Sequence, residues 1–507
     1  MKKVVIIGGG SAGWLTALYL QKTWPNLVIT VLEDPDTPPI IAGESSTTTF
    51  VDLLKYLDIM LEDWIVKTQA TPKMGGHFKN WNGIGTEFIH PLQTDVIPGY
   101  DLSTELKLDN ILTLGDWMQT SKTESARSNY IKSIIADDIK MDELFFSGEF
   151  IRQNKVPYMT TGTTKFPIDC MWHYESRNCA AYFKKIGLER NISLIEEKYK
   201  LCKRDNQGNI TSIILENGRS IDTDWIFDCS GFARLILGKE MQEPLVDFTN
   251  FFPARSVIAW WDQPIYQVTT NATAMEYGWS WNINLQHRSG NGYIYDPDLI
   301  TEDQALAEIT KTFGDITPVA KVRFNPGMMK SAWINNVIGI GLSTGFMEPL
   351  EANGIAVIIR GLTALSEMWD PFDTYSNRDR YNNTVWNFMI NIRDFISLHY
   401  RGNRRDTEFW QSHANDKERI PDSLTEKLHL WKEFYLNLRD LPIMDAYSST
   451  AWVTVLQGIS KFPTDNLKKS YNSQKTLNKS LRLEFQEQLS NCWTVDRWVH
   501  KFTNTAQ

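Results

Sequence analysis

The chain has 507 residues, of which 42% are hydrophobic and 22% charged, and its formal net charge is −9. This composition is ordinary for a globular protein, and a chain of this length forms more than one packed subdomain. The acidic balance argues against nucleic acid as a partner, and no apolar run reaches the roughly 18 residues that would span a membrane. Five widely spaced cysteines indicate neither a metal site nor a disulfide framework, so we expect a cytoplasmic protein.

A glycine-rich turn between a strand and a helix opens the chain. Lys2 to Ile7 is apolar and predicts a strand, and helical spacing continues from Trp14 to Lys22. Between them, Gly8, Gly10 and Gly13 form the pattern Gly-x-Gly-x-x-Gly. The first glycine allows a tight turn, the second lets the backbone approach a pyrophosphate, and the third lets the helix pack on the strand. We predict a Rossmann-type dinucleotide site; the alternative is a glycine-rich turn in another α/β protein.

The second predicted strand, Leu27 to Leu32, ends at Glu33. A carboxylate here can accept hydrogen bonds from an adenosine ribose, which favours FAD or NAD over NADP. A hairpin-like pair, Lys200 to Arg204 and Ile210 to Leu215, precedes an apolar strand that begins at Trp225. This late return of the chain to the nucleotide domain favours FAD.

The rest of the chain divides into strand-rich and helical parts. Residues 100–165 look irregular and partly helical, residues 245–300 alternate as strands do, and Ser376 to Tyr400 carries one apolar helix face. We predict an α/β fold with mixed sheets. Its discontinuous core spans residues 1–370, with sheet insertions around 80–165 and 240–335, and a helical subdomain over 371–507 covers the site.

A loop with two carboxylates joins a predicted strand, Asn336 to Gly341, to a predicted helix, Ile355 to Trp369. Glu348 and Glu351 lie in this loop. The free N–H groups and the positive dipole end of a helix start attract anions. An anion seat beside a carboxylate predicts a reactive site at this loop.

Six motifs follow one another along the chain: Gly8 to Trp14, Gly43 to Ser45, Ala70 to Gly75 with Phe78 and Trp81, Asp228 to Phe232, Trp279 to Ile283, and Phe346 to Ile355. Together they make the chain resemble the FAD-dependent halogenases, particularly the tryptophan halogenase branch, whose FAD-binding domain is like that of flavin monooxygenases. The resemblance covers roughly residues 1–430. It implies that a separate NAD(P)H-dependent flavin reductase supplies FADH2, which reacts with oxygen to a C4a-hydroperoxide. Halide is then oxidised to hypohalous acid, which passes to a lysine and halogenates an aromatic ring.

The resemblance also implies roles for individual residues. Lys73 and Glu351 match the catalytic pair, Asn353 and Gly354 the halide seat. Trp279 and Trp281 match the residues that shield the flavin, and His90 matches a residue of the aromatic pocket. The implied FAD contacts are Gly8, Gly10, Ser11, Ala12, Gly13, Glu33, Glu44, Ser45, Tyr199, Leu342 and Ile355.

Each role has a simpler alternative. Lys73 could be a surface lysine, which is how we interpret Lys79, and Glu351 could be an acid that complements the helix dipole. Trp279 and Trp281, two residues apart, could be strand residues that pack on one sheet face. His90 could be a hydrogen-bonded structural histidine.

Three positions depart from the family pattern. Asn284 replaces a proline and is expected to loosen a turn, Ala352 replaces a serine, and Asn353 replaces a threonine. The last two lie beside flavin and halide, which leads to the hypothesis that bromide or iodide is preferred over chloride.

The segment from Leu430 to Leu456 has Trp431, Phe434 and Tyr435 but does not match the family's clamp for tryptophan. We therefore predict a two-component halogenase of small electron-rich aromatics, such as indoles or phenols. The alternatives are a flavin-dependent aromatic monooxygenase and a flavin-binding protein without chemistry. The sequence leaves open whether the chain forms a homo-oligomer.

Overall fold

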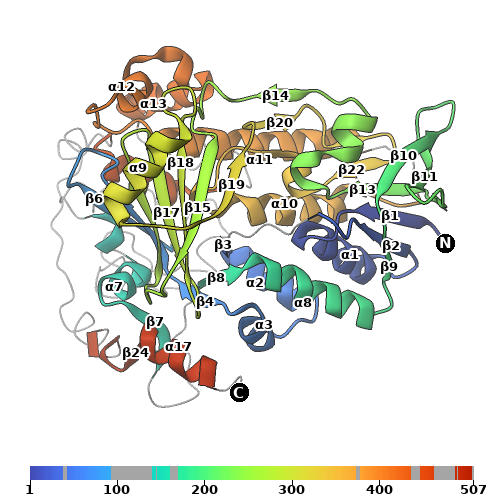
Figure 1. Cartoon of the computed structure of the whole chain (residues 1–507), viewed down its shortest axis with the longest axis horizontal. Helices are drawn as coiled ribbons and strands as arrows, with labels where there is room; N and C mark the ends of the chain where they lie inside the picture. Colours follow the sequence, from blue (N-terminus) through green and yellow to red (C-terminus); the bar gives the residue numbers. More distant parts are fainter. Residues whose placement is uncertain are drawn as a thin grey trace, which may run out of the picture.

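The computed structural model describes residues 1–37, 43–92, 140–143, 145–159, 170–372, 377–434, 446–461, 486–487 and 489–504. Two large sheets lie at opposite ends of the molecule, and two long helices cross between them (Figure 1). The expected irregular region at 100–165 falls largely outside the described residues.

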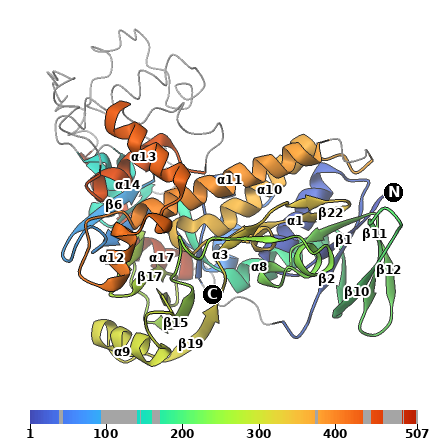
Figure 2. The same ribbon diagram turned by 90° about the horizontal axis from the view of Figure 1, so that it is seen from above.

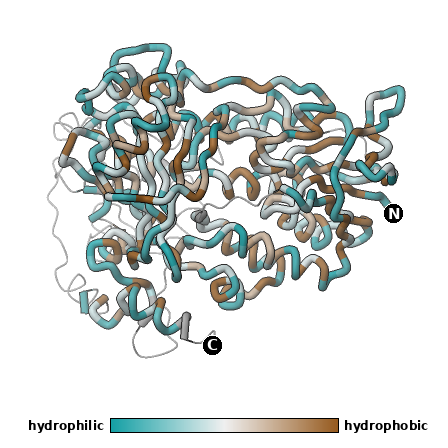
Figure 3. The backbone as a smooth tube through the Cα atoms, viewed as in Figure 1, coloured by the Kyte–Doolittle hydropathy of each residue, from teal (hydrophilic) through white to brown (hydrophobic). Residues whose placement is uncertain are grey.

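The sheet at the N-terminal end is the predicted nucleotide-binding layer. Its strand order is β21-β22-β13-β1-β2-β9, and all neighbours are parallel except β21 and β22. The strands are β1 (Lys3–Ile7), β2 (Val28–Glu33), β9 (Ser193–Glu196), β13 (Trp225–Asp228), β21 (Trp333–Ile334) and β22 (Val337–Gly339). Parallel strands covered on both faces read as continuous apolar runs, as β1 and β13 do (Figure 3). The predicted return of the chain at Trp225 is confirmed, because β13 pairs directly with β1.

The second large sheet joins two distant parts of the chain. Its order is β19-β15-β18-β17-β16-β5-β6, and β16 lies parallel to β5. The strands are β5 (Gly75–Lys79), β6 (Glu87–Pro91), β15 (Ser256–Asp262), β16 (Thr269–Ala274), β17 (Gly278–Asn284), β18 (Ser289–Tyr295) and β19 (Pro318–Arg323). The alternating pattern at 245–300 is thus confirmed as strands.

Four smaller sheets complete the strand pairing of the described residues: β3-β8-β4, β10-β11-β12, β14-β20-β23 and β24-β7. Their strands are β3 (Gly43–Ser45), β4 (Thr71–Lys73), β7 (Lys155–Met159), β8 (Met171–Glu175), β10 (Tyr199–Arg204), β11 (Ile210–Leu215), β12 (Ser220–Asp222), β14 (Leu245–Asp247), β20 (Gly327–Met329), β23 (Gly345–Phe346) and β24 (Cys492–Thr494). The β3-β8-β4 sheet was not predicted, and it positions the lysine discussed below.

The helices near the sheets are α1 (Ser11–Thr23), α2 (Thr48–Tyr56), α3 (Leu61–Thr68), α7 (Phe146–Arg152), α8 (Ser176–Glu189), α9 (Glu302–Phe313) and α10 (Asn353–Met368). Those of the C-terminal part are α11 (Arg378–His399), α12 (Glu408–Asn415), α13 (Asp422–Phe434), α14 (Ser449–Gly458) and α17 (Val495–Asn504). Helices α10 and α11 run side by side across the middle (Figure 2). Where the structure describes it, the C-terminal part is largely helical as predicted, and β24 is a strand within it. The boundary at residue 370 stays a prediction.

The predicted apolar face of α11 is buried. Its members are Tyr381, Val385, Phe388, Met389, Ile392 and Phe395. Spacings of three and four residues place them on one side of the helix, and this side lies against the core. None of the described helices is long and apolar enough to cross a membrane.

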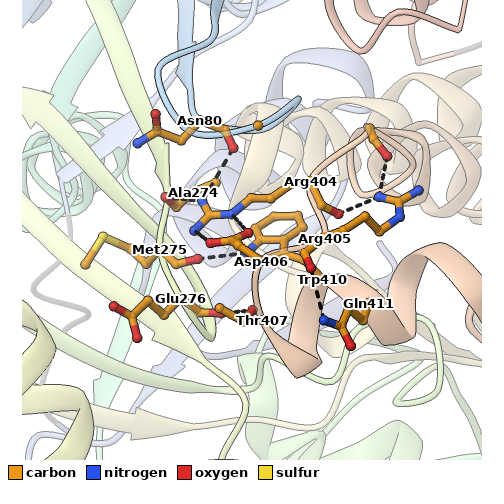
Figure 4. Close-up of polar contacts among 12 residues, drawn as sticks. Asn80, Ala274, Met275, Glu276, Arg404, Arg405, Asp406, Thr407, Trp410 and Gln411 are labelled. Atoms are coloured by element: carbon orange, nitrogen blue, oxygen red, sulfur yellow. Dashed lines mark hydrogen bonds and ion pairs between the residues drawn. The ribbon is translucent and has the colours of Figure 1, made fainter.

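The start of α12 and the segment before it hold the turn between β16 and β17 (Figure 4). The Arg404 guanidinium donates to the Ala274 carbonyl at 2.7 Å, and the Trp410 indole donates to the Met275 carbonyl at 2.8 Å. Thr407 donates to the carbonyl of Glu276 at 2.6 Å. Because β17 begins at the end of this turn, the helical part fixes the strand that carries the two predicted shielding tryptophans.

Candidate active site

Lys73 is buried, and the small β3-β8-β4 sheet positions it. β3 and β4 pair antiparallel with the two edges of β8, so Ser45 on β3 and Lys73 on β4 flank this central strand. The Lys73 Nζ atom donates to the Ser45 Oγ atom at 2.7 Å. Only 5% of Lys73 is exposed, which makes the surface-lysine alternative wrong. Burial lowers the pKa of Lys73 to about 8, against the opposing pull of the Glu351 charge.

Glu351 lies in the turn before α10 and pairs with two histidines. Its Oε1 atom is 2.7 Å from His90 Nδ1 and 3.1 Å from His399 Nε2. Burial alone would raise the pKa of Glu351, but His90 and His399 hold it well below its usual range. Glu351 and Ala352 both adopt left-handed backbone conformations, with φ of 62° and 56°. Non-glycine residues rarely do so, which shows that the turn is held by its surroundings.

His399 did not stand out in the sequence. It is the last residue of α11, four residues after Phe395 on the predicted apolar face, and it is fully buried. The signal that could have found it is a polar residue at a position where the pattern demands an apolar one.

The start of α10 is shaped by Asn353. Its side-chain Nδ2 atom donates to the carbonyls of Glu348 and Leu350, both at 2.8 Å. The amide is therefore committed to the turn. A side chain added at Gly354 would meet no heavy atom within 4 Å, so there is room at the helix start. The helix begins at Asn353, two residues before the predicted Ile355, which is itself buried.

Trp279 and Trp281 lie on the same face of β17, and both are buried. Their ring centroids are 6.0 Å apart, and Trp81 lies 6.1 Å from Trp279. The two tryptophans therefore pack on one sheet face, as the alternative interpretation had it, and their role in shielding the flavin stays a prediction. The Trp279 indole also approaches Glu348 without completing a hydrogen bond, since neither its Nε1 atom nor Glu348 Oε1 has a partner among the described residues.

His90 borders a cluster of aromatic rings. Its ring centroid is 6.0 Å from that of Phe395, and Phe395 stacks on Tyr447 at 3.9 Å. The Tyr447 hydroxyl donates to the carbonyl of Glu351 at 3.4 Å. Trp452 lies 5.0 Å from Phe395 and 5.3 Å from Trp431. The Glu351 carboxylate thus lies at the edge of an aromatic-lined region.

The expectation that Asn284 loosens a turn stays a prediction, because its two oxygens are bonded while its buried Nδ2 atom has no hydrogen-bond partner among the described residues. Asn284 is buried, and its Oδ1 atom accepts a hydrogen bond from Ser289 Oγ at 3.1 Å. Its backbone carbonyl accepts another from Thr71, two residues before Lys73. These bonds tie β17 to both β18 and β4.

The glycines of the first turn have the room and the close contacts that a pyrophosphate-binding turn needs. Gly8 has a φ of 117°, and a side chain at Gly13 would collide with the Gly8 carbonyl. A side chain at Gly10 would meet nothing within 4 Å, which leaves the start of α1 open. Ser11 is the first residue of α1. Ala12 faces the loop at Gly341, which precedes Leu342.

Glu33 ends β2 beside the glycine turn, and its side chain occupies the space next to Gly9. Its carboxylate pairs with Lys184 at 2.9 Å. Tyr199 lies at the start of β10, and its hydroxyl is bonded to Glu240. Ser45, another expected FAD contact, lies apart from these residues, on β3 next to Lys73. The side chain of Glu44 lies outside the described part of the chain. No described cluster of histidine, cysteine and acidic residues could hold a metal ion.

The family model of the tryptophan halogenases matches residues 3–473, so the chain belongs to this family of flavin-dependent halogenases. The 7-chloro-L-tryptophan 6-halogenase KtzR of Kutzneria sp. (strain 744) is 30% identical over 451 residues, covering 85% of this chain and 84% of that protein. The tryptophan 7-halogenase RebH of Lentzea aerocolonigenes is 29% identical over 451 residues, covering 85% of this chain and 82% of that protein.

The fold agrees with solved structures of the same class. The flavin-dependent halogenase BrvH of Brevundimonas sp. BAL3 superposes with a TM-score of 0.81 at 25% identity, covering 99% of both chains. The chain is therefore an oxidoreductase whose cofactor is FADH2, and the predicted α/β flavin-binding fold is confirmed.

Proposed function

We propose that this enzyme halogenates small electron-rich aromatics, such as indoles or phenols, with Lys73 and Glu351 directing the electrophilic step. The observation that carries the proposal is the buried Lys73, whose pKa of about 8 leaves part of its amine neutral near physiological pH. A solvated lysine, with a pKa of about 10.4, is almost entirely protonated at that pH. Lys73 can hold hypohalous acid by a hydrogen bond or as a haloamine, and Ser45 fixes its Nζ atom.

Glu351 would act on the ring that is being halogenated. The aromatic C–H bond is replaced by a carbon–halogen bond, and the hydroxide of hypohalous acid takes up one proton and leaves as water. The proton that the ring gives up replaces that proton, so the aromatic and hypohalous acid yield the halogenated ring and water only. A carboxylate with a lowered pKa is a weak base, but a protonated arene is a strong acid, so Glu351 can accept this proton. The aromatic rings around Phe395 and Tyr447 support a flat substrate next to it.

The residues at the glycine turn fit FAD. Gly10 leaves space for a pyrophosphate at the start of α1, and Glu33 offers a carboxylate to the adenosine ribose. When bound and reduced, FAD with oxygen supplies the oxidising power that turns halide into hypohalous acid. Members of this family need a reduced flavin, and we propose a separate NAD(P)H-dependent flavin reductase as its source.

The halide is proposed to lie at Asn353 and Gly354, where the helix start is open. Bromide or iodide is our preferred halide, on the basis of the departures at Ala352 and Asn353, and no heavy atom within 4 Å of a side chain added at Gly354 would crowd a larger ion. The relatives named above are tryptophan halogenases, and free tryptophan belongs in the substrate panel as the test of our preference for smaller aromatics.

The test is a halide panel with purified enzyme, FAD, a generic flavin reductase and NADH. Chloride, bromide or iodide is combined with indoles, phenols and tryptophan, and mass spectrometry identifies the products in the presence of catalase. Lys73→Met should lower halogenated product by about 10²- to 10⁴-fold, because positioned proton donors and acceptors contribute on this scale. Lys79→Met is the matched control, a half-exposed lysine six residues away, and should keep activity.

Two results would overturn the proposal. Oxygenated product formed without halide would identify a monooxygenase. Halogenated product that is unchanged in Lys73→Met, or that disappears with catalase, would assign the chemistry to free peroxide instead.

A further inference from the structure

The chain contains two buried histidines that make the same local hydrogen bond in different surroundings. His399 Nδ1 lies 2.9 Å from the carbonyl of Phe395, and His413 Nδ1 lies 2.9 Å from the carbonyl of Phe409. Each carbonyl belongs to the residue four positions earlier in its helix. A carbonyl oxygen can only accept, so Nδ1 carries a proton in both rings.

The two rings differ at the other nitrogen. His413 Nε2 makes no hydrogen bond of normal geometry among the described residues. Burial lowers the pKa of His413 to about 3, although the backbone groups of Phe409 and Phe251 oppose this shift. That ring is neutral at physiological pH. His399 Nε2 instead lies 3.1 Å from Glu351 Oε1.

Glu351 can only accept at that contact. One oxygen, Oε1, lies 2.7 Å from His90 Nδ1 and 3.1 Å from His399 Nε2, and an oxygen that receives two N–H donors is stabilised as a carboxylate. A neutral His399 has one N–H and would turn a lone pair either toward this carboxylate or toward the Phe395 carbonyl. Both contacts are buried, where an unmade hydrogen bond is costly. Only a ring protonated at both nitrogens satisfies both acceptors.

We propose that His399 is an imidazolium at neutral pH, and that this cation is a positioning residue that fixes Glu351 as an ionised partner for Lys73. The proposal rests on the proposed role of Glu351. Three titratable groups interact with the Glu351 carboxylate: His399 on α11, His90 on β6 and Lys73 on β4. His90 makes a single contact to Glu351, through Nδ1.

This charge has a consequence for Lys73. The negative charge of Glu351 raises the pKa of Lys73, and a cation on the far side of the same carboxylate offsets part of that pull. His399 thereby helps to keep a share of Lys73 neutral. Removing its charge, with His90 still bonded to Glu351, should leave Lys73 more firmly protonated.

The first experiment measures the charge directly in the whole, unaltered enzyme. Histidine labelled with ¹⁵N in the ring is incorporated, and the ring nitrogens are read by NMR at neutral pH. An imidazolium gives two nitrogen signals close together, and a neutral ring gives two that are widely separated. His399→Gln and His413→Gln assign the two residues. We expect imidazolium signals for His399 and neutral signals for His413; a neutral His399 overturns the proposal.

The second experiment measures the titration of Lys73 by NMR of ¹³C-labelled lysine, assigned with Lys73→Met. His399→Gln can still donate one hydrogen bond but carries no charge, and a melting curve verifies that it folds. Its Lys73 midpoint should shift upward relative to the parent, whereas His413→Gln should leave the midpoint unchanged. An unchanged midpoint in both variants overturns the role. Neither measurement uses turnover, so a failure of the halogenase proposal would show separately, in the halide panel.

Discussion

Glu348 and Glu351 lie in one short turn, and their surroundings move the pKa values of the two carboxyl groups in opposite directions. Glu351 faces two histidines and stays ionised. Glu348 is fully buried without a cation, and burial raises its pKa to about 8 despite a hydrogen bond from the Tyr400 hydroxyl at 2.7 Å. At neutral pH one acid is therefore charged and the other mostly neutral. The sequence placed both in the same loop but could not separate them.

The raised pKa of Glu348 makes the fold sensitive to alkaline pH. Its folded pKa of about 8 exceeds the ordinary value of 4.5, so between these values the folded state binds more protons than the unfolded state. Stability therefore falls as pH rises across this window, by up to about 1.4 kcal/mol per unit. Glu348→Gln cannot ionise and should remove this loss while keeping an acceptor for Tyr400.

Melting curves of the parent and of Glu348→Gln between pH 5.5 and 8 measure the effect. The gap between the two melting temperatures should grow in favour of the variant as pH rises. Glu62→Gln, at an exposed position in α3, should follow the parent throughout. A constant gap for Glu348→Gln would show that the pKa of this carboxyl is not raised in the folded protein.

At the scale of elements, the turn before α10 depends on the side chain of one asparagine. Asn353→Ala removes two hydrogen bonds to backbone carbonyls and should cost about 1–3 kcal/mol. It should also raise the apparent KM for halide, because the helix start that forms the proposed seat loses its support. Steady-state halogenation at varied bromide, together with chemical denaturation, measures both effects.

Asn336 provides the matched control for this change. It is buried, and its Nδ2 atom donates to the carbonyls of Ile210 and Asp224 at 2.7 and 2.9 Å, while its Oδ1 atom accepts from the Ile210 backbone N–H at 2.9 Å. Asn336→Ala should cost at least as much free energy of unfolding as Asn353→Ala and leave the halide KM unchanged. Equal halide effects in the two variants would mean that the KM reports stability alone.

The segment that holds the β16–β17 turn yields a second prediction for an element (Figure 4). Arg404 is buried, pairs with Asp406 at 2.7 Å and lies over the Trp410 ring at 5.0 Å. Arg404→Ala leaves the carboxylate and the Ala274 carbonyl without their donor and should cost roughly 3–5 kcal/mol. The neighbouring Arg405 bonds only to nearby carbonyls, of Gly402 and Arg404, so Arg405→Ala should cost under about 1 kcal/mol. Similar melting temperatures for the two variants would contradict this assignment.

The elements that the sequence predicted share one property, which is local periodicity. The strand and helix at the glycine turn, the hairpin at 199–215 and the apolar face of α11 all repeat at intervals that a short window shows. The β3-β8-β4 sheet has two strands of three residues each, too short for any period. It forms by pairing segments that lie far apart in sequence, so only the structure could explain why Lys73 is buried beside Ser45.

At the scale of the whole molecule, the end of the chain packs behind the sheet that carries the reactive lysine. Strand β24 pairs with β7, and Trp498 of α17 is fully buried with its ring 5.7 Å from that of Trp172. Trp172 lies on β8 opposite Pro72, the residue before Lys73. The last helix thus supports the central strand of the β3-β8-β4 sheet from the side away from Lys73, since successive strand residues face opposite ways.

Trp498→Ala should therefore cost about 3–5 kcal/mol, as deletion of a fully buried tryptophan does, and should disturb the reactive lysine from a distance. We expect a lower melting temperature and a changed titration midpoint for Lys73 in the ¹³C-lysine spectrum, because its burial depends on this sheet. Trp261, which is 45% exposed, is the control, and Trp261→Ala should change both quantities little. A destabilised Trp498→Ala enzyme with an unshifted Lys73 midpoint would show that the C-terminal helix supports the fold without reaching the site.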